Sequence, residues 1–307
     1  MHLLLGDPQD SFCLSIRHAL EALSYPVRMI ANPVVHPSRF EWRLNNDQSA
    51  SQLVWGDEPP LHDNELAGVL VRSAGWLDPD GWRPEDLAYT QAETQAALLA
   101  WLWSLPCPVV NRYSPSLWYC PQPPFLSWRP MLRRCGLPTM EALVTNVETE
   151  ARAFGRELAL TGFPGTVYSP LTDELHYLVM DDKEWGGLAA LQRVAPVCLA
   201  PPHGETQMVC VVGEQVIWEG APCSEAALLE PALRRFASEI GLCFVALALA
   251  LAQSPGGIAV IAVETHPCLE LFGTVAQEQI VQGIVHILTG QNDARHGTQP
   301  VMDRSSL

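Results

Sequence analysis

The longest uninterrupted apolar runs lie near the C-terminus, where two of them flank a turn. The first run lies within residues 242–252, the second spans residues 258–263, and Gln-Ser-Pro-Gly-Gly at 253–257 separates them. Proline and paired glycines are typical of turns, so this pattern predicts a β-hairpin of two buried strands. Three polar residues follow the second strand: Glu264, Thr265 and His266. Polar groups are expensive to place at the end of a buried strand. They either cap the next segment or form a site, and we favour a site.

The N-terminal residues follow a strand, helix, strand pattern. Met1–Leu5 is an apolar strand, Ser11 can cap a helix whose apolar residues recur at helical spacing, and Val27–Ile30 is a second strand. This order predicts the first unit of an open α/β sheet. Gly6 and Asp7 could contact a phosphate in such a unit. No G-x-G-x-x-G pattern follows them, which favours an ordinary tight turn.

Helices and short strands continue to mix along the rest of the chain, which predicts an α/β (α+β) fold class. Residues 33–63 are polar, with isolated aromatic residues, and are expected to be irregular apart from a short strand at 52–55. Three loop tryptophans, Trp76, Trp82 and Trp118, either line a ligand surface or pack in small clusters. The predicted helices span 90–105, 126–135, 147–158, 224–240 and 275–288, and the further strands span 67–72, 109–110, 142–145, 166–169, 175–180, 206–212 and 215–219.

Composition and charge narrow the classes of function. The chain has 307 residues, is 48% hydrophobic and carries a formal net charge of -16, with a pI near 4.9. An acidic chain repels phosphate backbones, so no nucleic-acid partner is expected. The N-terminus lacks the charged and apolar regions of a signal peptide, and the apolar run at 242–252 is too short to span a bilayer. We therefore expect a cytoplasmic protein with no membrane partner.

Cysteine and lysine usage add two constraints. The nine cysteines are scattered and include no C-x-x-C pair. This is typical of small core residues in a reducing cytoplasm, and it disfavours a disulfide framework or a zinc site. Of the 18 basic residues, 17 are arginines and a single one, Lys183, is a lysine. Any mechanism that needs two lysines is therefore excluded.

Several segments between about residues 67 and 290 occur in an order that resembles the ATP-grasp superfamily. They are VLVRSAGW (69–76), ETQAALLAWLWSLPCPVVNR (93–112), LRRCGLPTMEALVTN (132–146), VCVVGEQVIWEG (209–220), ASEIGLCFVALAL (237–249) and VIAVETHP (260–267). The chain is most similar to the peptide-modifying ligases of the microviridin/graspetide type and to ribosomal-protein glutamate ligases. The resemblance implies an N-terminal βαβ domain followed by central and C-terminal ATP-grasp subdomains.

The family's nucleotide site has a defined set of charged residues. Two lysines contact the phosphates, acidic groups and usually an asparagine hold Mg²⁺, and an arginine steadies the acyl-phosphate, because the reacting groups are anionic. In this sequence the lysine positions fall near Phe125 and at Tyr168 or Ser169. The arginine position falls at Met208, and one acidic position falls at Ala248. The other acidic position is Glu264, and the asparagine position is His266.

Two interpretations follow from this pattern. We favour a degenerate ATP-grasp fold that binds a peptide or protein, or that partners an active ligase, with no cofactor. The alternative is an active, divergent carboxylate-amine ligase that uses Mg-ATP. In that case Glu264 and His266 hold a metal, and Arg112, Arg129 or Lys183 replaces the phosphate lysines. Members of the family often dimerise, so the resemblance also allows a homodimer.

Each candidate residue has a structural alternative. Arg72 and Arg112 follow predicted strands and are candidates for a cleft, but structural ion pairs are at least as common. His266 can simply hydrogen-bond the turn before Pro267, and Lys183 can pair with a neighbouring aspartate. The expected domain limits are 1–124 for the N-terminal domain, 125–195 for the central subdomain, 196–290 for the C-terminal subdomain and 291–307 for a frayed tail.

Overall fold

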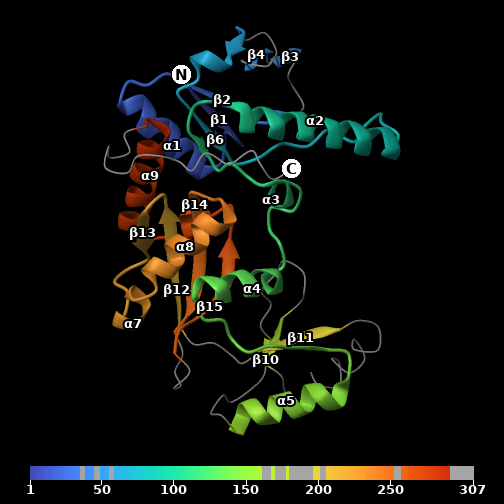
Figure 1. Ribbon diagram of the computed structural model, residues 1–307, viewed down its shortest axis with the longest axis vertical. Coiled ribbons are helices and arrows are strands. Elements are labelled where there is room, and N and C mark those ends of the chain that lie inside the picture. Colours follow the sequence, from blue (N-terminus) through green and yellow to red (C-terminus); the bar gives the residue numbers. More distant parts are fainter. Residues whose placement is uncertain are drawn as a thin grey trace, which may run out of the picture.

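The strands in the described part of the chain form four sheets, arranged along the molecule in an order that differs from the chain order (Figure 1). The N-terminal sheet lies at the top of Figure 1, the last sheet lies in the middle, and the sheet between them in sequence lies at the bottom. The computed structural model describes residues 1–34, 39–44, 49–54, 59–160, 167–169, 178–179, 196–200, 205–251 and 257–290. No helix in this described part of the chain has the length and apolar character needed to cross a membrane.

The first sheet is parallel, with strand order β2-β1-β6-β7, and it confirms the predicted βαβ opening. Its strands are short and almost wholly apolar, as expected for a parallel sheet covered on both faces. Asp10, and not Ser11, caps the first helix, because its Oδ1 accepts from the N–H of Phe12 at 3.0 Å. The elements of this unit are β1 (His2–Leu5), α1 (Ser11–Ala22), β2 (Val27–Ile30), β6 (Gly68–Val71), α2 (Pro84–Ser104) and β7 (Val109–Val110).

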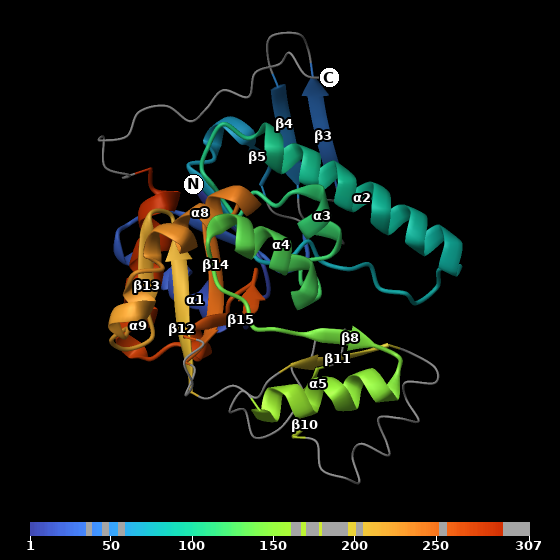
Figure 2. The same ribbon diagram turned by 60° about the horizontal axis from the view of Figure 1, so that its bottom comes forward.

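Residues 39–62 contain a three-stranded antiparallel sheet. Its middle strand overlaps the short strand expected at 52–55, but the expectation of irregular structure around that strand is wrong. Ser51 is 4% exposed and accepts a hydrogen bond at 2.7 Å from the indole N–H of Trp101 in α2. A polar residue therefore lies at a buried position of the middle strand. Because of this, the alternation of apolar and polar residues that indicates a strand is weak there. Figure 2 shows these strands beside α2. They are β3 (Arg39–Leu44), β4 (Ser49–Val54) and β5 (Leu61–His62).

Two helices around β7 also differ from the sequence prediction. α2 begins at Pro84 rather than at residue 90, because Pro84 takes an initial helical position and Glu85 and Asp86 lie in the first turn. A short helix, α3 (Pro115–Tyr119), lies in the proline-rich segment expected to be loop. The hydroxyl of Ser114 caps α3 by accepting from the N–H of Leu117. This helix positions two aromatic residues of the site described below.

The next segment forms a helix and then an antiparallel sheet with strand order β10-β9-β11-β8. The helix ends as predicted at Gly136, which adopts a left-handed conformation with φ of 83°. Figure 2 shows α5 beside β8 and β11 at the far end of the molecule. The elements are α4 (Phe125–Cys135), β8 (Leu143–Thr145), α5 (Glu148–Leu160), β9 (Val167–Ser169), β10 (Leu178–Val179) and β11 (Val197–Ala200).

The last sheet is antiparallel, with strand order β13-β12-β14-β15, and contains both predicted hairpins. Residues 252–256 of the second turn lie outside the described residues. The predicted helix at 224–240 is two helices, because Pro231 lacks the N–H that would continue the first one. The elements are β12 (Thr206–Val212), β13 (Gln215–Trp218), α7 (Ser224–Ala227), α8 (Glu230–Ile240), β14 (Phe244–Ala250), β15 (Ala259–Glu264), η2 (Leu269–Leu271) and α9 (Thr274–Leu288).

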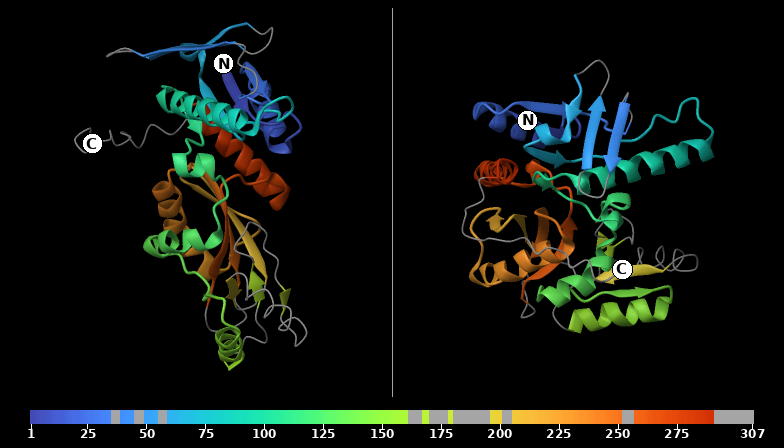
Figure 3. Two further views of the ribbon diagram at one scale, coloured as in Figure 1. Left: turned by 90° about the vertical axis from the view of Figure 1, so that its right-hand side faces the viewer. Right: turned by 45° about the horizontal axis from the view of Figure 1, so that its top comes forward.

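Helix α9 joins the first sheet to the last one. It contacts α1, β6 and β7 on one side and β12 and β13 on the other, and Figure 3 shows it between the two sheets. Phe12 of α1 stacks on Phe244 of β14, with ring centroids 4.9 Å apart. Asn111 follows β7, is 2% exposed, and exchanges two hydrogen bonds with the backbone of Phe244. The apolar core and the hydrogen bonds of Asn111 therefore hold the two sheets together. The candidate site lies at this junction.

Candidate functional site

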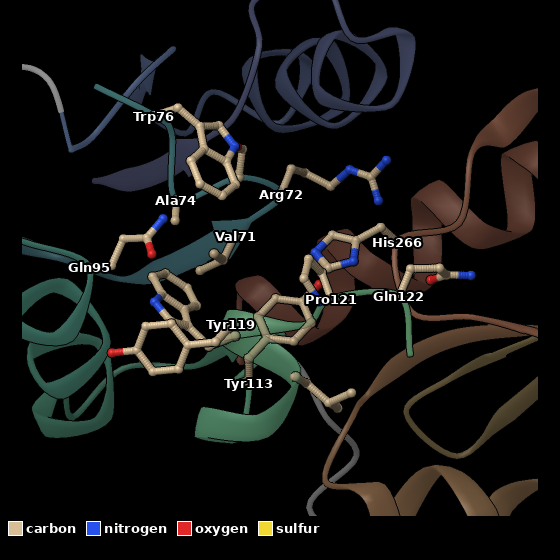
Figure 4. Close-up of a pocket in the computed structure, with 13 residues that line it drawn as sticks. Val71, Arg72, Ala74, Trp76, Gln95, Tyr113, Tyr119, Pro121, Gln122 and His266 are labelled. Carbon is tan, nitrogen blue, oxygen red and sulfur yellow. The ribbon is translucent and has the colours of Figure 1, made fainter. Parts of the chain in front are cut away.

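A cavity of about 360 Å³ opens at the carboxyl end of β6. In open parallel sheets this edge is the usual place for a ligand. Its walls are aromatic: Tyr113 and Trp118 are buried, whereas Trp76 and Tyr119 are 71% and 53% exposed and stand at the mouth. Figure 4 shows three polar side chains together on the opposite side, whereas Gln95 lies on the aromatic side. They are Arg72, Gln122 and His266.

Arg72 is the buried cation of this cavity. Its side chain is 9% exposed, and its Nε donates to Oδ2 of Asp10 at 3.2 Å. The guanidinium also lies over the ring of Phe12, with Cζ 4.8 Å from the ring centroid. Asp10 therefore balances the charge, and the aromatic ring adds a cation–π contact. Nη1 is buried and has no hydrogen-bond acceptor among the described residues.

His266 lies beside Arg72 and is held from two sides. Its ring stacks on Tyr113, with centroids 4.8 Å apart and an interplanar angle of 9°. Its Nδ1 lies 3.1 Å from Oγ1 of Thr265, and that hydroxyl donates a short hydrogen bond to the carbonyl of Pro121. Burial, together with the charge of Arg72, lowers the pKa of His266 to about 4. The ring is therefore neutral at pH 7.

Glu264 is connected to His266 through Gln122 and Thr265. The Nε2 of Gln122 donates to Oε2 of Glu264 at 2.9 Å and to the carbonyl of Val263 at 3.0 Å. Its Oε1 lies 3.3 Å from Oγ1 of Thr265. Burial raises the pKa of Glu264, and the hydrogen bond from Gln122 opposes this shift only in part. Glu264, the last residue of β15, and His266, two residues after it, thus lie at the ends of one hydrogen-bonded chain.

The metal site expected at Glu264 and His266 stays a prediction. The two side chains bring one carboxylate and one neutral imidazole, which is few for Mg²⁺. In the part of the chain that the structure describes, no group of three or more His, Cys, Asp or Glu side chains could hold a metal ion.

Arg112 is committed to the backbone and does not contribute to the cavity lining. Its Nη1 donates to the carbonyls of Leu102 and Trp103 at 2.7 and 2.9 Å, and its Nη2 donates to those of Leu105 and Cys107 at 2.7 and 3.0 Å. These carbonyls belong to the last turn of α2 and the residues after it, where helices lack internal donors. Arg112 therefore caps the end of α2, and its expected place in a nucleotide or substrate cleft stays a prediction.

The other two cationic candidates lie away from the cavity or outside the described residues. Arg129 of α4 donates from Nη2 to the carbonyl of Met140 at 2.7 Å. Its charge also acts on the thiol of Cys198, so its guanidinium lies near the sheet that contains β11. Lys183 lies outside the described residues.

The last sheet carries a row of small or apolar side chains across three strands. Met208 of β12 pairs with Ala248 of β14, which pairs with Ala262 of β15. Ala248 and Ala262 are 6% and 7% exposed, and Met140 and Met208 pack on the cluster to which they belong. Glu264 pairs with Ala246, two residues along β14, and so shares this face. Met208 and Ala248 are the positions where the resemblance places an arginine and an aspartate.

Comparisons with known proteins match this architecture to solved structures. No protein-family model matches the sequence, and no curated protein matches it. The macrocyclase MdnC from Microcystis aeruginosa MRC, bound with the precursor peptide MdnA, is 18% identical, with a TM-score of 0.68 over 94% of this chain and 99% of that one. A RiPP-associated ATP-grasp ligase from Chryseobacterium gregarium, in complex with ADP and a leader and core peptide, is 13% identical, with a TM-score of 0.71 over 95% and 97%. The ATP-grasp ligase PsnB, complexed with a minimal precursor, Mg and ADP, is 20% identical, with a TM-score of 0.69 over 93% and 98%.

The chain has the ATP-grasp fold. The likeness covers nearly the whole length of both partners, so the fold expectation drawn from the sequence is confirmed. Identities of 13–20% define the ATP-grasp fold and not the reaction, because function depends on the side chains of the site. The function of this protein therefore has to be inferred from the side chains of its site.

Sequence reasoning missed part of the site. Trp76 and Trp118 line the cavity, as one of the two alternatives for the loop tryptophans proposed, whereas Trp82 is not among the residues that line it. Tyr113 and Gln122 were not candidates. Gln122 lies between prolines in a segment expected to be loop, and its neighbours give no signal of a partner 142 residues away. Tyr113 directly follows Arg112, so its position next to the Asn-Arg pair after β7 is the sequence signal that could have identified it.

Proposed function

We propose that this chain is a degenerate ATP-grasp protein that binds a peptide and does not ligate it. It acts either in peptide recognition or as the partner of an active ligase in a peptide-modification pathway. All three structures described above are complexes with precursor, leader or core peptides. These complexes support a peptide as the binding partner. The side chains of the last sheet support the loss of ligation.

The observation that carries this proposal is the row Met208, Ala248 and Ala262. Transfer of a phosphoryl group needs fixed cations and metal-bound oxygen ligands around the triphosphate. This row offers a thioether and two methyl groups, and the nearby Glu264 is held by the neutral amide of Gln122. These residues do not fit Mg-ATP. The net charge of -16 adds long-range repulsion of an anionic nucleotide.

Calorimetric titration with Mg-ATP tests the loss of nucleotide binding. Each missing charge-assisted hydrogen bond typically reduces the free energy of binding by about 1.5–3 kcal/mol. The loss of three such bonds therefore weakens nucleotide binding by several orders of magnitude. We therefore expect no binding at micromolar concentrations and no hydrolysis by the purified protein. Glu264→Ala and Glu278→Ala, an exposed glutamate on α9, form a matched pair. Neither variant should change the result.

The alternative function is an active, divergent ligase that uses Mg-ATP. Two observations favour it: Glu264 is retained at the end of β15, and Arg129 stands close to Met140 beside the apolar row. An arginine can replace a phosphate-binding lysine because it binds oxyanions in a bidentate manner. Micromolar Mg-ATP binding that is lost in Glu264→Ala and kept in Glu278→Ala would establish this alternative and refute the degenerate protein.

The peptide partner is tested separately from the nucleotide. A short precursor peptide or an intact ligase encoded beside this gene is the expected partner, and each can be purified and titrated into the protein. Saturable binding of the peptide or the ligase supports the proposal. If neighbouring genes encode neither, or if neither product binds, then the assignment to a peptide-modification pathway is wrong.

A further inference from the structure

The aromatic cavity at the end of β6 has an incomplete set of hydrogen bonds, and this set defines the group that fits it. The cavity is separate from the apolar row of the last sheet, because Met208, Ala248 and Ala262 do not line it. Its volume of about 360 Å³ suits one or two amino-acid residues. Four aromatic side chains supply an apolar surface for most of such a ligand.

Arg72 supplies donors that have no acceptor within the described part of the chain. Its Nε is used by Asp10, but Nη1 is buried and unpartnered. A buried donor without an acceptor is destabilising. In Figure 4 the guanidinium of Arg72 lies beside the ring of His266 at the polar side of the cavity. A ligand that brings an acceptor to this side recovers the missing hydrogen bond.

His266 supplies an acceptor, which follows from the order of donors and acceptors behind it. The hydroxyl of Thr265 has a single proton, and two acceptors face it, the carbonyl of Pro121 and Oε1 of Gln122. The hydroxyl oxygen must therefore accept the hydrogen bond that joins it to Nδ1 of His266, so Nδ1 carries the proton. In a neutral ring Nε2 then has a lone pair, with no partner among the described residues. Figure 4 shows one ring nitrogen of His266 directed toward Val71 and the interior of the cavity.

The charges of the cavity distinguish between possible ligand groups. Asp10 already balances the charge of Arg72 at 3.2 Å. A carboxylate can accept from Arg72 but has no proton to donate to Nε2 of His266. Its oxygen lone pair would therefore repel the lone pair of Nε2. An ammonium group has protons for His266 but is repelled by Arg72. A carboxamide or peptide amide has both an acceptor oxygen and an N–H donor, and it is neutral.

We propose that this cavity binds a neutral amide group of a peptide, with its carbonyl oxygen on Arg72 and its N–H on Nε2 of His266. The apolar side chain next to that amide lies among Trp76, Tyr113 and Trp118. The amide is a backbone amide or the side-chain carboxamide of asparagine or glutamine. This assignment rests on the proposed peptide-binding function and narrows it to a preference for amide over carboxylate.

Two small probes that differ in one group test this preference on the unmodified protein. N-acetyl-phenylalanine amide carries an aromatic side chain and a terminal carboxamide, and N-acetyl-phenylalanine carries a carboxylate at the same place. Titration followed by nuclear magnetic resonance at pH 7.5 should show saturable binding of the amide, about tenfold tighter than that of the acid. Equal affinities, tighter binding of the acid, or no saturable binding of either probe would overturn the proposal.

Two variants then assign the preference to His266. His266→Phe keeps a ring to stack on Tyr113 but removes the lone pair, so the amide should lose about tenfold in affinity and the acid should change little. Trp82→Ala, whose indole is 45% exposed and is not among the lining residues, should leave both affinities unchanged. An amide preference that persists in His266→Phe refutes the role of Nε2.

The two proposals fail in different ways. A partner peptide that binds equally well to the unmodified protein and to His266→Phe keeps the proposed function and removes this inference. A partner peptide that does not bind at all, while the amide probe still binds, removes the pathway assignment and keeps the chemistry of the cavity.

Discussion

Replacing Asn111 by aspartate turns one donor into an acceptor at the buried junction of the first and last sheets. In the native protein Nδ2 of Asn111 donates to the carbonyl of Phe244 at 2.7 Å, and Oδ1 accepts from the N–H of Phe244 at 2.9 Å. The side chain is 2% exposed. In Asn111→Asp at neutral pH, a carboxylate oxygen faces the carbonyl of Phe244, so a favourable contact becomes a repulsive one.

The size of this effect follows from the cost of burying the charge. Burial and the facing carbonyl raise the pKa of the new carboxyl above about 3.9, its value in the unfolded chain, whereas the N–H of Phe244 opposes the shift. A net rise of about two units corresponds to roughly 3 kcal/mol at pH 7. For a chain of this length that is a fall of about 5 °C in Tm.

The pH dependence gives the prediction its sign. The folded-state pKa of the carboxyl is raised, so the protonated form is stable in the fold below about pH 4 and this stability is lost as the pH rises through the folded-state pKa. When it is protonated, the new carboxyl of Asn111→Asp can donate to the carbonyl of Phe244, as the native amide does. The deficit relative to the native protein should therefore be small near pH 4 and should increase to its full value near pH 7.

Thermal unfolding followed by circular dichroism at pH 4, 5.5 and 7.5 measures this difference. Asn64→Asp is the matched control, because Asn64 is exposed and the same chemical change there should shift Tm by no more than about 1 °C. Two results would contradict the idea that Asn111 joins the two sheets. One is a Tm for Asn111→Asp equal to that of the native protein at pH 7.5, and the other is a decrease in Tm that does not depend on pH.

Two further predictions concern the sequence-based candidates. Arg112→Ala should lower stability by about 3 kcal/mol, because it leaves four carbonyls after α2 without a donor; Arg17→Ala, which breaks an exposed ion pair with Glu21, should cost no more than about 1 kcal/mol in urea unfolding. Equal costs would contradict the capping role. If Glu264 and His266 hold a metal, Mg²⁺ or a divalent transition metal should raise Tm in the native protein and not in Glu264→Gln, with the transition metal preferred because of the nitrogen ligand; no rise with either metal would end that hypothesis.

The sequence predicts the fold where local patterns and long-range packing agree. The apolar run of β14 is buried at every position, and Pro-Gly-Gly before β15 is a turn signal that no helix tolerates. Gly136 and Gly241 end α4 and α8 in the left-handed conformation, as a glycine after a helical pattern indicates. These elements are set by neighbours in the chain, so the sequence contains enough information to place them.

The prediction fails where a distant residue decides the structure. Ser51 is buried in β4 because Trp101, fifty residues away, donates to it. No pattern around Ser51 contains that partner. Gln122 likewise gains its role from Glu264 and Thr265 across the molecule. Sequence reasoning therefore identified part of the candidate site: Arg72 and the end of β15 were recognised, but Tyr113 and Gln122, which contact the end of β15, were not.

The number of arginines in the sequence does not equal the number of arginines that have free hydrogen-bond donors. Arg112 uses both terminal nitrogens on carbonyls, and Arg129 has one of its own on Met140. Arg72 is matched by Asp10 and has one buried nitrogen without a partner among the described residues. An anion such as a triphosphate needs several free, charged donors that converge on one place. A neutral amide needs one donor and one acceptor, which Arg72 and His266 supply together. The same arginines that make a charged cleft plausible in the sequence thus favour, once their partners are known, a site for an uncharged peptide group.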